Sequence, residues 1–164
     1  MPEVKLISGA LFDSLARAAA ASPRLRTNFN FHAGPSDNPH RFLNVLLQGT
    51  YVQPHRHSLP PKDETFVVLE GAADVFLFDD GGAVTARHHL GGESEDGRLW
   101  GIDIPAGAWH TILPRSGVAV CFEVKPGPWD PSTDKEFAPW APAEGDPAAP
   151  AYAQTLLGGD PLVR

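Results

Sequence analysis

The sequence predicts an all-β fold, an antiparallel sandwich or barrel, and three observations point to it. From residue 27 onward, hydrophobic residues recur with a period of two, which is typical of strands with one buried face. The predicted strands are short and rich in branched and aromatic residues, and glycine, proline or aspartate separates nearly all of them. One segment alone reads as a convincing helix, and this scarcity of helices favours antiparallel pairing.

The strands are expected where these alternating segments lie, at residues 27–32, 41–48, 65–69, 73–79, 83–90, 99–104, 109–113 and 118–124. Residues 79–82, DDGG, predict a hairpin turn because their glycines accept positive φ. The expected helix covers residues 7–22, with Ser8 as its N-cap and Pro23 as its stop. We expect it to pack on the outside of the barrel or against a second subunit.

The chain of 164 residues suits one domain, and its four segments differ in composition. The region after residue 125 has too many prolines for regular structure, yet it carries large rings that pack on surfaces, namely Trp129, Phe137 and Trp140. We therefore expect an N-terminal helix at 1–25, a barrel at 26–125, an ordered arm at 126–145 and a flexible tail at 146–164.

Charge and composition exclude several classes of protein. The net charge of −7 and the lack of a basic stripe argue against nucleic-acid binding. The single cysteine, Cys121, forms no internal disulfide, and we read it as a small buried residue. Neither a signal peptide nor a membrane-spanning segment is recognisable, so a cytoplasmic protein is expected.

A histidine pair in YVQPHRHSLPPKDE, residues 51–64, indicates a metal site. Residues two apart in a strand face the same way, so His55 and His57 can both point inward. Glu64 begins the next strand and can reach the same point, and His110 enters a later strand after a Pro-Ala-Gly turn. These four side chains suit one divalent transition metal ion, Fe, Mn, Ni, Co or Zn. The neighbouring Asp63 is a competing carboxylate.

The number of protein ligands stays open at this point. Four ligands on an octahedral ion leave two positions for a substrate or oxygen. If Glu64 or one histidine sits back, the remainder forms a two-histidine, one-carboxylate arrangement with more open positions.

The segment GTYVQPHRHSLPPKDETFVVLEG resembles the first motif of the cupin superfamily, with His55, His57 and Glu64 at the ligand positions. PAGAWH resembles the second motif and places His110 as a ligand. The loop before Glu64 is longer than in the general pattern, and Pro114 stands where that pattern has asparagine. The resemblance implies a cupin-type double-stranded β-helix, or jelly-roll barrel, with a mononuclear metal.

The segments SPRLRTNFNFH and VKPGPWDPSTDKEFAPWAPAEG are also similar to the WbuC-type cupin-fold metalloproteins. That likeness implies a bacterial protein with a cupin barrel and a bound metal. Members of that family are often associated with O-antigen polysaccharide gene clusters, so polysaccharide biosynthesis is the expected setting. Cupins often pair through sheet edges, so a homodimer is expected.

Further candidates surround the expected site. Tyr51 and Gln53 share the parity of His55, so Tyr51 is a candidate proton carrier and Gln53 a candidate substrate ligand. Glu123 is a candidate acid or base if its face looks inward, and a solvated carboxylate otherwise. We expect Phe66 and Phe76 to form the apolar wall of the pocket.

Arg24 and Arg26 can clamp an anionic substrate, although surface or inter-subunit pairing is their ordinary role. His32 and His40 are expected to be loop or edge residues rather than ligands. His88 and His89 are adjacent and face opposite sides of a strand, so at most one of them can look inward, and neither is expected to be functional.

Three functions follow from these residues. The first is a metal-dependent enzyme acting on a small polar molecule such as a sugar, by isomerisation, epimerisation or oxygen chemistry. The second is a non-catalytic protein that binds or senses a small ligand through the metal. The third is a barrel in which the metal only braces the strands. Open coordination positions favour the first function over the third.

Overall fold

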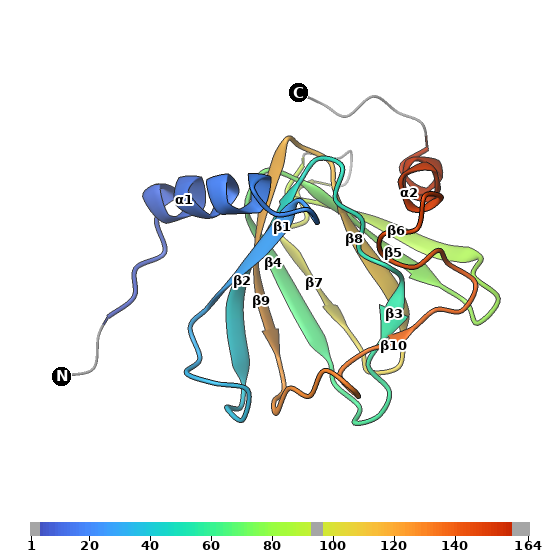
Figure 1. Ribbon diagram of the computed structural model, residues 1–164, viewed down its shortest axis with the longest axis horizontal. Coiled ribbons are helices and arrows are strands. Elements are labelled where there is room, and N and C mark those ends of the chain that lie inside the picture. Colours follow the sequence, from blue (N-terminus) through green and yellow to red (C-terminus); the bar gives the residue numbers. More distant parts are fainter. Residues whose placement is uncertain (1–3, 93–96, 159–164) are drawn as a thin grey trace.

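The computed structural model describes residues 4–92 and 97–158, and it confirms the predicted cupin-type jelly-roll barrel. Two five-stranded antiparallel sheets face each other, one in the order β1-β2-β9-β4-β7 and the other in the order β10-β3-β8-β5-β6 (Figure 1). The strands are β1 Arg26–Asn30, β2 His40–Leu47, β3 His55–Arg56, β4 Glu64–Glu70, β5 Ala73–Phe78, β6 Val84–Leu90, β7 Gly101–Ile104, β8 Trp109–Pro114, β9 Val118–Lys125 and β10 Glu136–Phe137.

Helix α1, Gly9–Ala20, covers the outer face of the first sheet beside β1 and β2 (Figure 1). Ser8 caps the helix as expected, because its side chain accepts a hydrogen bond from the backbone N–H of Leu11. Under the helix lies an apolar cluster of fully buried side chains, Ala19, Leu43, Val45 and Val120. Leu43 and Val45 of β2 and Val120 of β9 therefore point outward from the barrel and pack against this helix.

The C-terminal arm and a second helix cover the outer face of the second sheet. Strand β10 adds the arm to the sheet by pairing with β3. Residues 146–164 were expected to be a flexible tail, and this is wrong for helix α2, Ala149–Leu156. Ala149 and Ala153 are buried against the barrel, and this packing stabilises a helix in a proline-rich context. The rest of that tail, from residue 159, lies outside the described residues.

The barrel interior is apolar in one part and polar in another. The apolar part combines both sheets and is formed by Leu46, Val52, Phe66, Val68, Ala73, Val75, Leu90, Ile104, Ile112, Ala119 and Cys121. Buried polar side chains occupy the other part, and His55, His57, His110 and Glu64 are among them. Buried polar groups of this kind need partners, so this polar interior is the natural place to look for a functional site.

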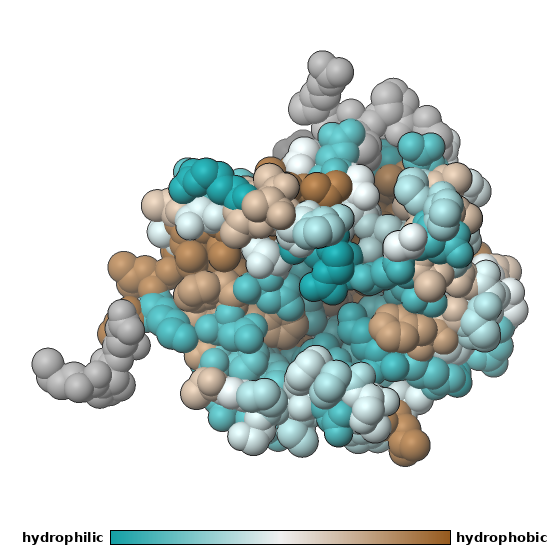
Figure 2. Space-filling view, in the orientation of Figure 1, coloured by the Kyte–Doolittle hydropathy of each residue, from teal (hydrophilic) through white to brown (hydrophobic). Residues whose placement is uncertain are grey.

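The surface in the view of Figure 2 is mainly hydrophilic. Hydrophobic residues gather beside α1 and the N-terminal segment, where Val4, Leu6 and Ile7 are exposed. In the described part of the chain, neither helix has the length and apolar character that a bilayer span requires.

Candidate metal centre

Three histidines bring their imidazoles together inside the barrel. His55 of β3 lies directly opposite His110 of β8 in the strand register, and His57 follows shortly after β3. The ring centroids lie 4.5 Å apart for His55 and His110, 5.2 Å for His55 and His57, and 5.9 Å for His57 and His110. All three side chains are buried, so the rings form one compact cluster.

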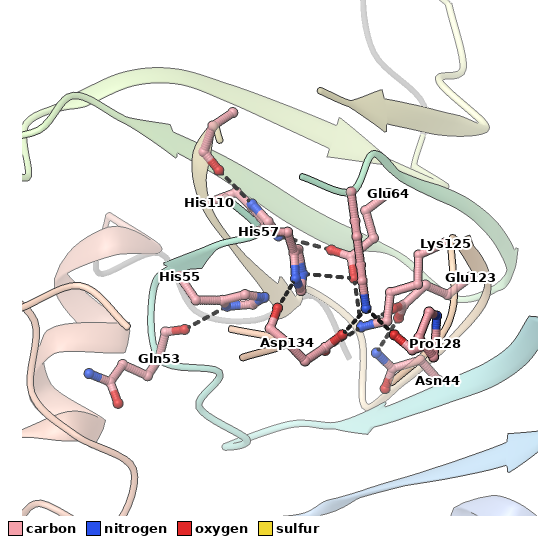
Figure 3. Close-up of polar contacts among 12 residues, drawn as sticks. Asn44, Gln53, His55, His57, Glu64, His110, Glu123, Lys125, Pro128 and Asp134 are labelled. Carbon is pink, nitrogen blue, oxygen red and sulfur yellow. Dashed lines mark hydrogen bonds and ion pairs between the residues drawn. The ribbon is translucent and has the colours of Figure 1, made fainter. Parts of the chain in front are cut away.

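Glu64 supplies a carboxylate to this cluster from the other sheet. Its Oε2 atom lies 3.0 Å from Nε2 of His110, and its Oε1 atom lies 3.2 Å from Nε2 of His57. One ligand atom from each of the four residues lies within 4.8 Å of the others, and Figure 3 shows the side chains converging. The structure thus brings together the four ligands predicted from the sequence. Asp63 points elsewhere and accepts a hydrogen bond from the backbone N–H of Ala106.

Backbone carbonyls fix the orientation of each imidazole. Nδ1 of His55 bonds to the carbonyl of Gln53 at 2.9 Å, and Nδ1 of His110 bonds to the carbonyl of Ala108 at 2.9 Å. Nδ1 of His57 bonds to the carbonyl of Asp134. A carbonyl oxygen can only accept, so each Nδ1 carries a proton and Nε2 is the ring nitrogen that each imidazole turns toward the cluster. This is the arrangement that metal-binding histidines adopt.

The residues present fit a divalent metal ion. Among the described residues, the buried Nε2 atoms of His55 and His57 have no hydrogen-bond partner. Leaving two such atoms unpaired in a protein interior is costly, and a cation between them and Glu64 would satisfy both. Imidazole nitrogens with one carboxylate oxygen suit first-row divalent ions.

The protonation states of the cluster also suit a metal. Burial lowers the pKa of His55 well below its usual value, and the charge of Lys135 adds to the effect. Burial alone would raise the pKa of Glu64, but contacts with His110 and His57 and the charge of Lys125 hold it well below its usual value. A neutral imidazole and an ionised carboxylate are the forms that coordinate metals.

A buried network of charges holds Glu64 in place (Figure 3). Nζ of Lys125 lies 3.3 Å from Oε1 of Glu64 and 3.1 Å from Oδ2 of Asp134. The other carboxylate oxygen of Asp134 lies 2.8 Å from Nζ of Lys62, which also donates to the carbonyl of Pro128. Asp134 therefore links the carboxylate side of the cluster to His57, because its backbone carbonyl accepts from that imidazole.

Glu123 lies on the inward face of β9, so the inward alternative of the sequence analysis holds. Burial raises the pKa of Glu123 well above its usual value, and the negative charge of Glu64 raises it further. Asn44 donates a hydrogen bond of 3.0 Å to Oε2 of Glu123. A carboxyl group whose pKa is raised in this way is suited to exchange a proton with a bound molecule.

A cavity of about 500 Å³ opens beside this network, a volume typical of small-molecule sites. Polar and charged side chains from β1, β2, β9 and the C-terminal arm dominate its lining. The lining residues are Arg24, Arg26, Asn28, Asn30, His32, Ala33, Gly34, Pro35, His40, Phe42, Asn44, Val52, Glu123, Lys125, Trp129, Asp134 and Lys135.

Two of the predicted site residues lie away from the cluster, and both expectations are wrong. The hydroxyl of Tyr51 donates to the carbonyl of Pro142 at 2.8 Å, and its ring packs on Tyr152 of α2. Phe76 is buried under α2 and the arm, on the outer face of the second sheet, and so it does not form a pocket wall. Both residues belong to the cluster that fixes the C-terminal region to the barrel.

Other predicted residues have roles different from those expected. Gln53 contacts the cluster through its backbone carbonyl, whereas its side chain points away from His55 (Figure 3). Phe66 lies in the apolar interior. Arg24 and Arg26 line the cavity, but both reach Glu144, at 3.9 Å and 2.5 Å. Ordinary ion pairing therefore accounts for the two arginines.

Sequence reasoning missed the lysines and the aspartate that surround Glu64. Lys125 lies two residues after Glu123 in β9, so the alternation of that strand predicts that both side chains face the barrel interior. Lys62 and Asp134 lie in loops, where neither periodicity nor spacing predicts which side chains are buried.

Comparison with known families now places the chain. Residues 7–90, more than half of its length, match a family described as a domain of unknown function, DUF6016. The chain belongs to the DUF6016 family. No curated protein matches its sequence.

Solved structures resemble this DUF6016 protein in fold. The capsular polysaccharide assembling protein CapF from Staphylococcus aureus matches with a TM-score of 0.55 and 23% identity over 71% of this chain. The chain spans about a third of CapF, 32% of its length. CapF with the inhibitor 3-isopropenyl-tropolone gives a TM-score of 0.52 at 23% identity, covering 67% of this chain and 31% of CapF.

A second protein matches over most of both lengths. Protein SO0799 from Shewanella oneidensis has a TM-score of 0.55 and 12% identity, covering 84% of this chain and 85% of that protein. At these identities the likeness shows the fold alone.

Proposed function

We propose that this DUF6016 protein is a metal-dependent enzyme that acts on a small polar molecule. His55, His57, Glu64 and His110 would hold one divalent ion, Fe, Mn, Ni, Co or Zn. The observation that carries the proposal is the convergence of three imidazole Nε2 atoms and one carboxylate. Lys125 and Asp134, which contact Glu64 and His57, line an adjoining cavity of about 500 Å³. A purely structural metal would need no such cavity.

A bound ion would act as a Lewis acid that polarises an oxygen atom of the substrate. The chain's own residues would do the rest. Glu123 would exchange a proton with the substrate, since its pKa is raised well above its usual value and its side chain lines the cavity. Lys125 and Asp134 would hold Glu64 and His57 in position.

The substrate that we propose is a sugar or a polysaccharide precursor, converted by an isomerase, epimerase or oxygenase type of reaction. Two resemblances support this class. The sequence is similar to WbuC-type proteins, and CapF, whose fold is alike, is named for capsular polysaccharide assembly. The protein would act in a bacterium, in O-antigen polysaccharide biosynthesis. It would do so as a homodimer, which sedimentation measurements would test.

The test combines metal analysis with a ligand that binds metals. The purified protein should carry about one divalent ion per chain. A tropolone has a ketone and a hydroxyl oxygen on adjacent carbons, so it should perturb the visible spectrum of the Co²⁺-loaded protein. Turnover of a sugar or sugar nucleotide by the loaded protein, lost in Glu123→Gln with the metal retained, would support the enzyme. Tight ligand binding without turnover across a broad screen would instead support a binding or sensor protein.

A further inference from the structure

Lys135 is a cation that the cavity holds without a protein partner. It lies in the arm between the buried Asp134 and strand β10, is half-buried, and lines the cavity. Within residues 4–92 and 97–158, it makes no hydrogen bond and no carboxylate oxygen lies within 4.0 Å of its ammonium group. An ammonium in such a position is stabilised by an anion, and among the described residues the protein places carboxylates near it but none in contact with it.

The other charged side chains of the cavity are already engaged. Arg24 and Arg26 reach Glu144. Lys125 pairs with Glu64 and Asp134. These pairs leave Lys135 as the one unpaired cation in the described cavity lining, so the cavity offers a single positive charge to a ligand.

Lys135 is close enough to the metal centre for its charge to act there. Its charge lowers the pKa of His55, second to burial. Burial lowers the pKa of Lys135 itself, while the charges of Glu64, Glu123 and Asp134 act in the opposite direction. These carboxylates act on Lys135 from a distance, so an anion bound in the cavity would give the ammonium a partner in direct contact.

The rest of the lining suits hydroxyl groups. Asn28 and Asn44 face each other across β1 and β2, and Asn30 follows on the same face of β1. Carboxamides donate and accept, so they recognise hydroxyls. Oδ1 of Asn44 is buried and has no hydrogen-bond partner among the described residues.

We propose that the cavity binds a small hydroxycarboxylate, such as a sugar acid, and that Lys135 pairs with its carboxylate. This inference rests on the proposed function, because it names the substrate class of the same site. A carboxylate carries one negative charge and matches the single unpaired ammonium. A phosphate monoester carries nearly two charges at neutral pH and would leave one of them uncompensated.

The experiment measures binding of three probes to the Co²⁺-loaded protein by calorimetry: D-gluconate, D-glucose and D-glucose 6-phosphate. We expect gluconate to bind at least about tenfold more tightly than either of the others. Lys135→Met should reduce gluconate affinity to the level of glucose, and Lys135→Arg should keep most of it. Arg98→Met, which removes an exposed cation that packs on Trp100, should bind gluconate like the wild type.

Metal content, measured on every variant, separates the two proposals. Lys135→Met with full metal content and unchanged gluconate affinity would overturn the role of Lys135, as would preferential binding of the phosphate or no gluconate binding at millimolar concentration. A wild type that takes up no metal would overturn the proposed function instead. Gluconate titrated into that metal-free protein would still test the pairing with Lys135.

Discussion

The Nε2 atom of His110 and the Oε2 atom of Glu64 lie 3.0 Å apart, although the two residues come from different sheets. Nδ1 of His110 donates to the carbonyl of Ala108, so Nε2 is the ring nitrogen that faces the carboxylate. Two acceptors at this distance repel unless a proton or a cation lies between them. The same relationship recurs between His57 and Glu64, and one divalent ion would resolve both contacts.

The first prediction concerns the ligands. His57→Ala should lose most of the bound metal, because it removes an Nε2 atom from the centre of the cluster. His88→Ala should keep the metal, since His88 of β6 is not part of the cluster. Elemental analysis of both purified variants checks this. If both variants retain the wild-type metal content, the ligand assignment fails.

The histidine cluster was predictable because its signals are local. His55 and His57 are two residues apart, and the motif PAGAWH marks His110 in the sequence. Strand β8 then pairs His110 with His55 of β3. The alternation argument failed at Tyr51 because β3 spans only His55–Arg56, so residues 51–54 are not a strand with alternating faces. Parity holds within a strand and cannot be carried past its end.

The outer face of the second sheet was not predictable for a different reason. Both faces of β5 are buried, so the sequence of that strand does not reveal which face points inward. The covering element is α2, which has Pro150 in its first turn and lies in a segment whose composition indicates a loop. Its stability comes from long-range packing on the barrel, and local sequence patterns do not report such contacts.

A second prediction concerns the charge network. Asp134→Asn keeps the shape of the side chain but leaves the buried Lys62 and Lys125 short of a counter-charge. Breaking a buried ion pair in this way costs about 3 to 5 kcal/mol of unfolding free energy. Urea denaturation measures the loss. Asp13→Asn, on the exposed side of α1, is the control and should change stability by less than about 0.5 kcal/mol. Equal stability of the two variants would contradict the network.

A third prediction tests the structural role of Tyr51. Tyr51→Phe removes the hydroxyl that donates to the carbonyl of Pro142 and should cost about 1 kcal/mol of unfolding free energy. Metal content and any turnover should stay at wild-type levels, because the residue lies under the C-terminal region rather than in the cavity. Loss of turnover with unchanged stability would return Tyr51 to the site as a proton carrier.

The last prediction concerns pH and the stacked pair of His32 and His40, whose ring centroids lie 4.0 Å apart. Burial lowers the pKa of His40 below its usual value, and the charge of His32 lowers it further. Lys125 and Lys62 act in the same direction, whereas the hydrogen bond to the carbonyl of Pro35 opposes them. The folded protein therefore favours a neutral imidazole at this position.

The sign of the effect follows from proton uptake. An unfolded histidine titrates near pH 6.5, so below that pH the unfolded chain binds more protons at residue 40 than the folded chain does. Stability from this residue is complete above about pH 7 and is lost as the pH falls through 6.5 toward the lower folded pKa. His40→Gln keeps a donor for Pro35 but cannot titrate. Urea unfolding at pH 7.5 and 5.5 should therefore show a smaller loss of stability on acidification for His40→Gln than for the wild type, and equal losses would contradict the role of His40.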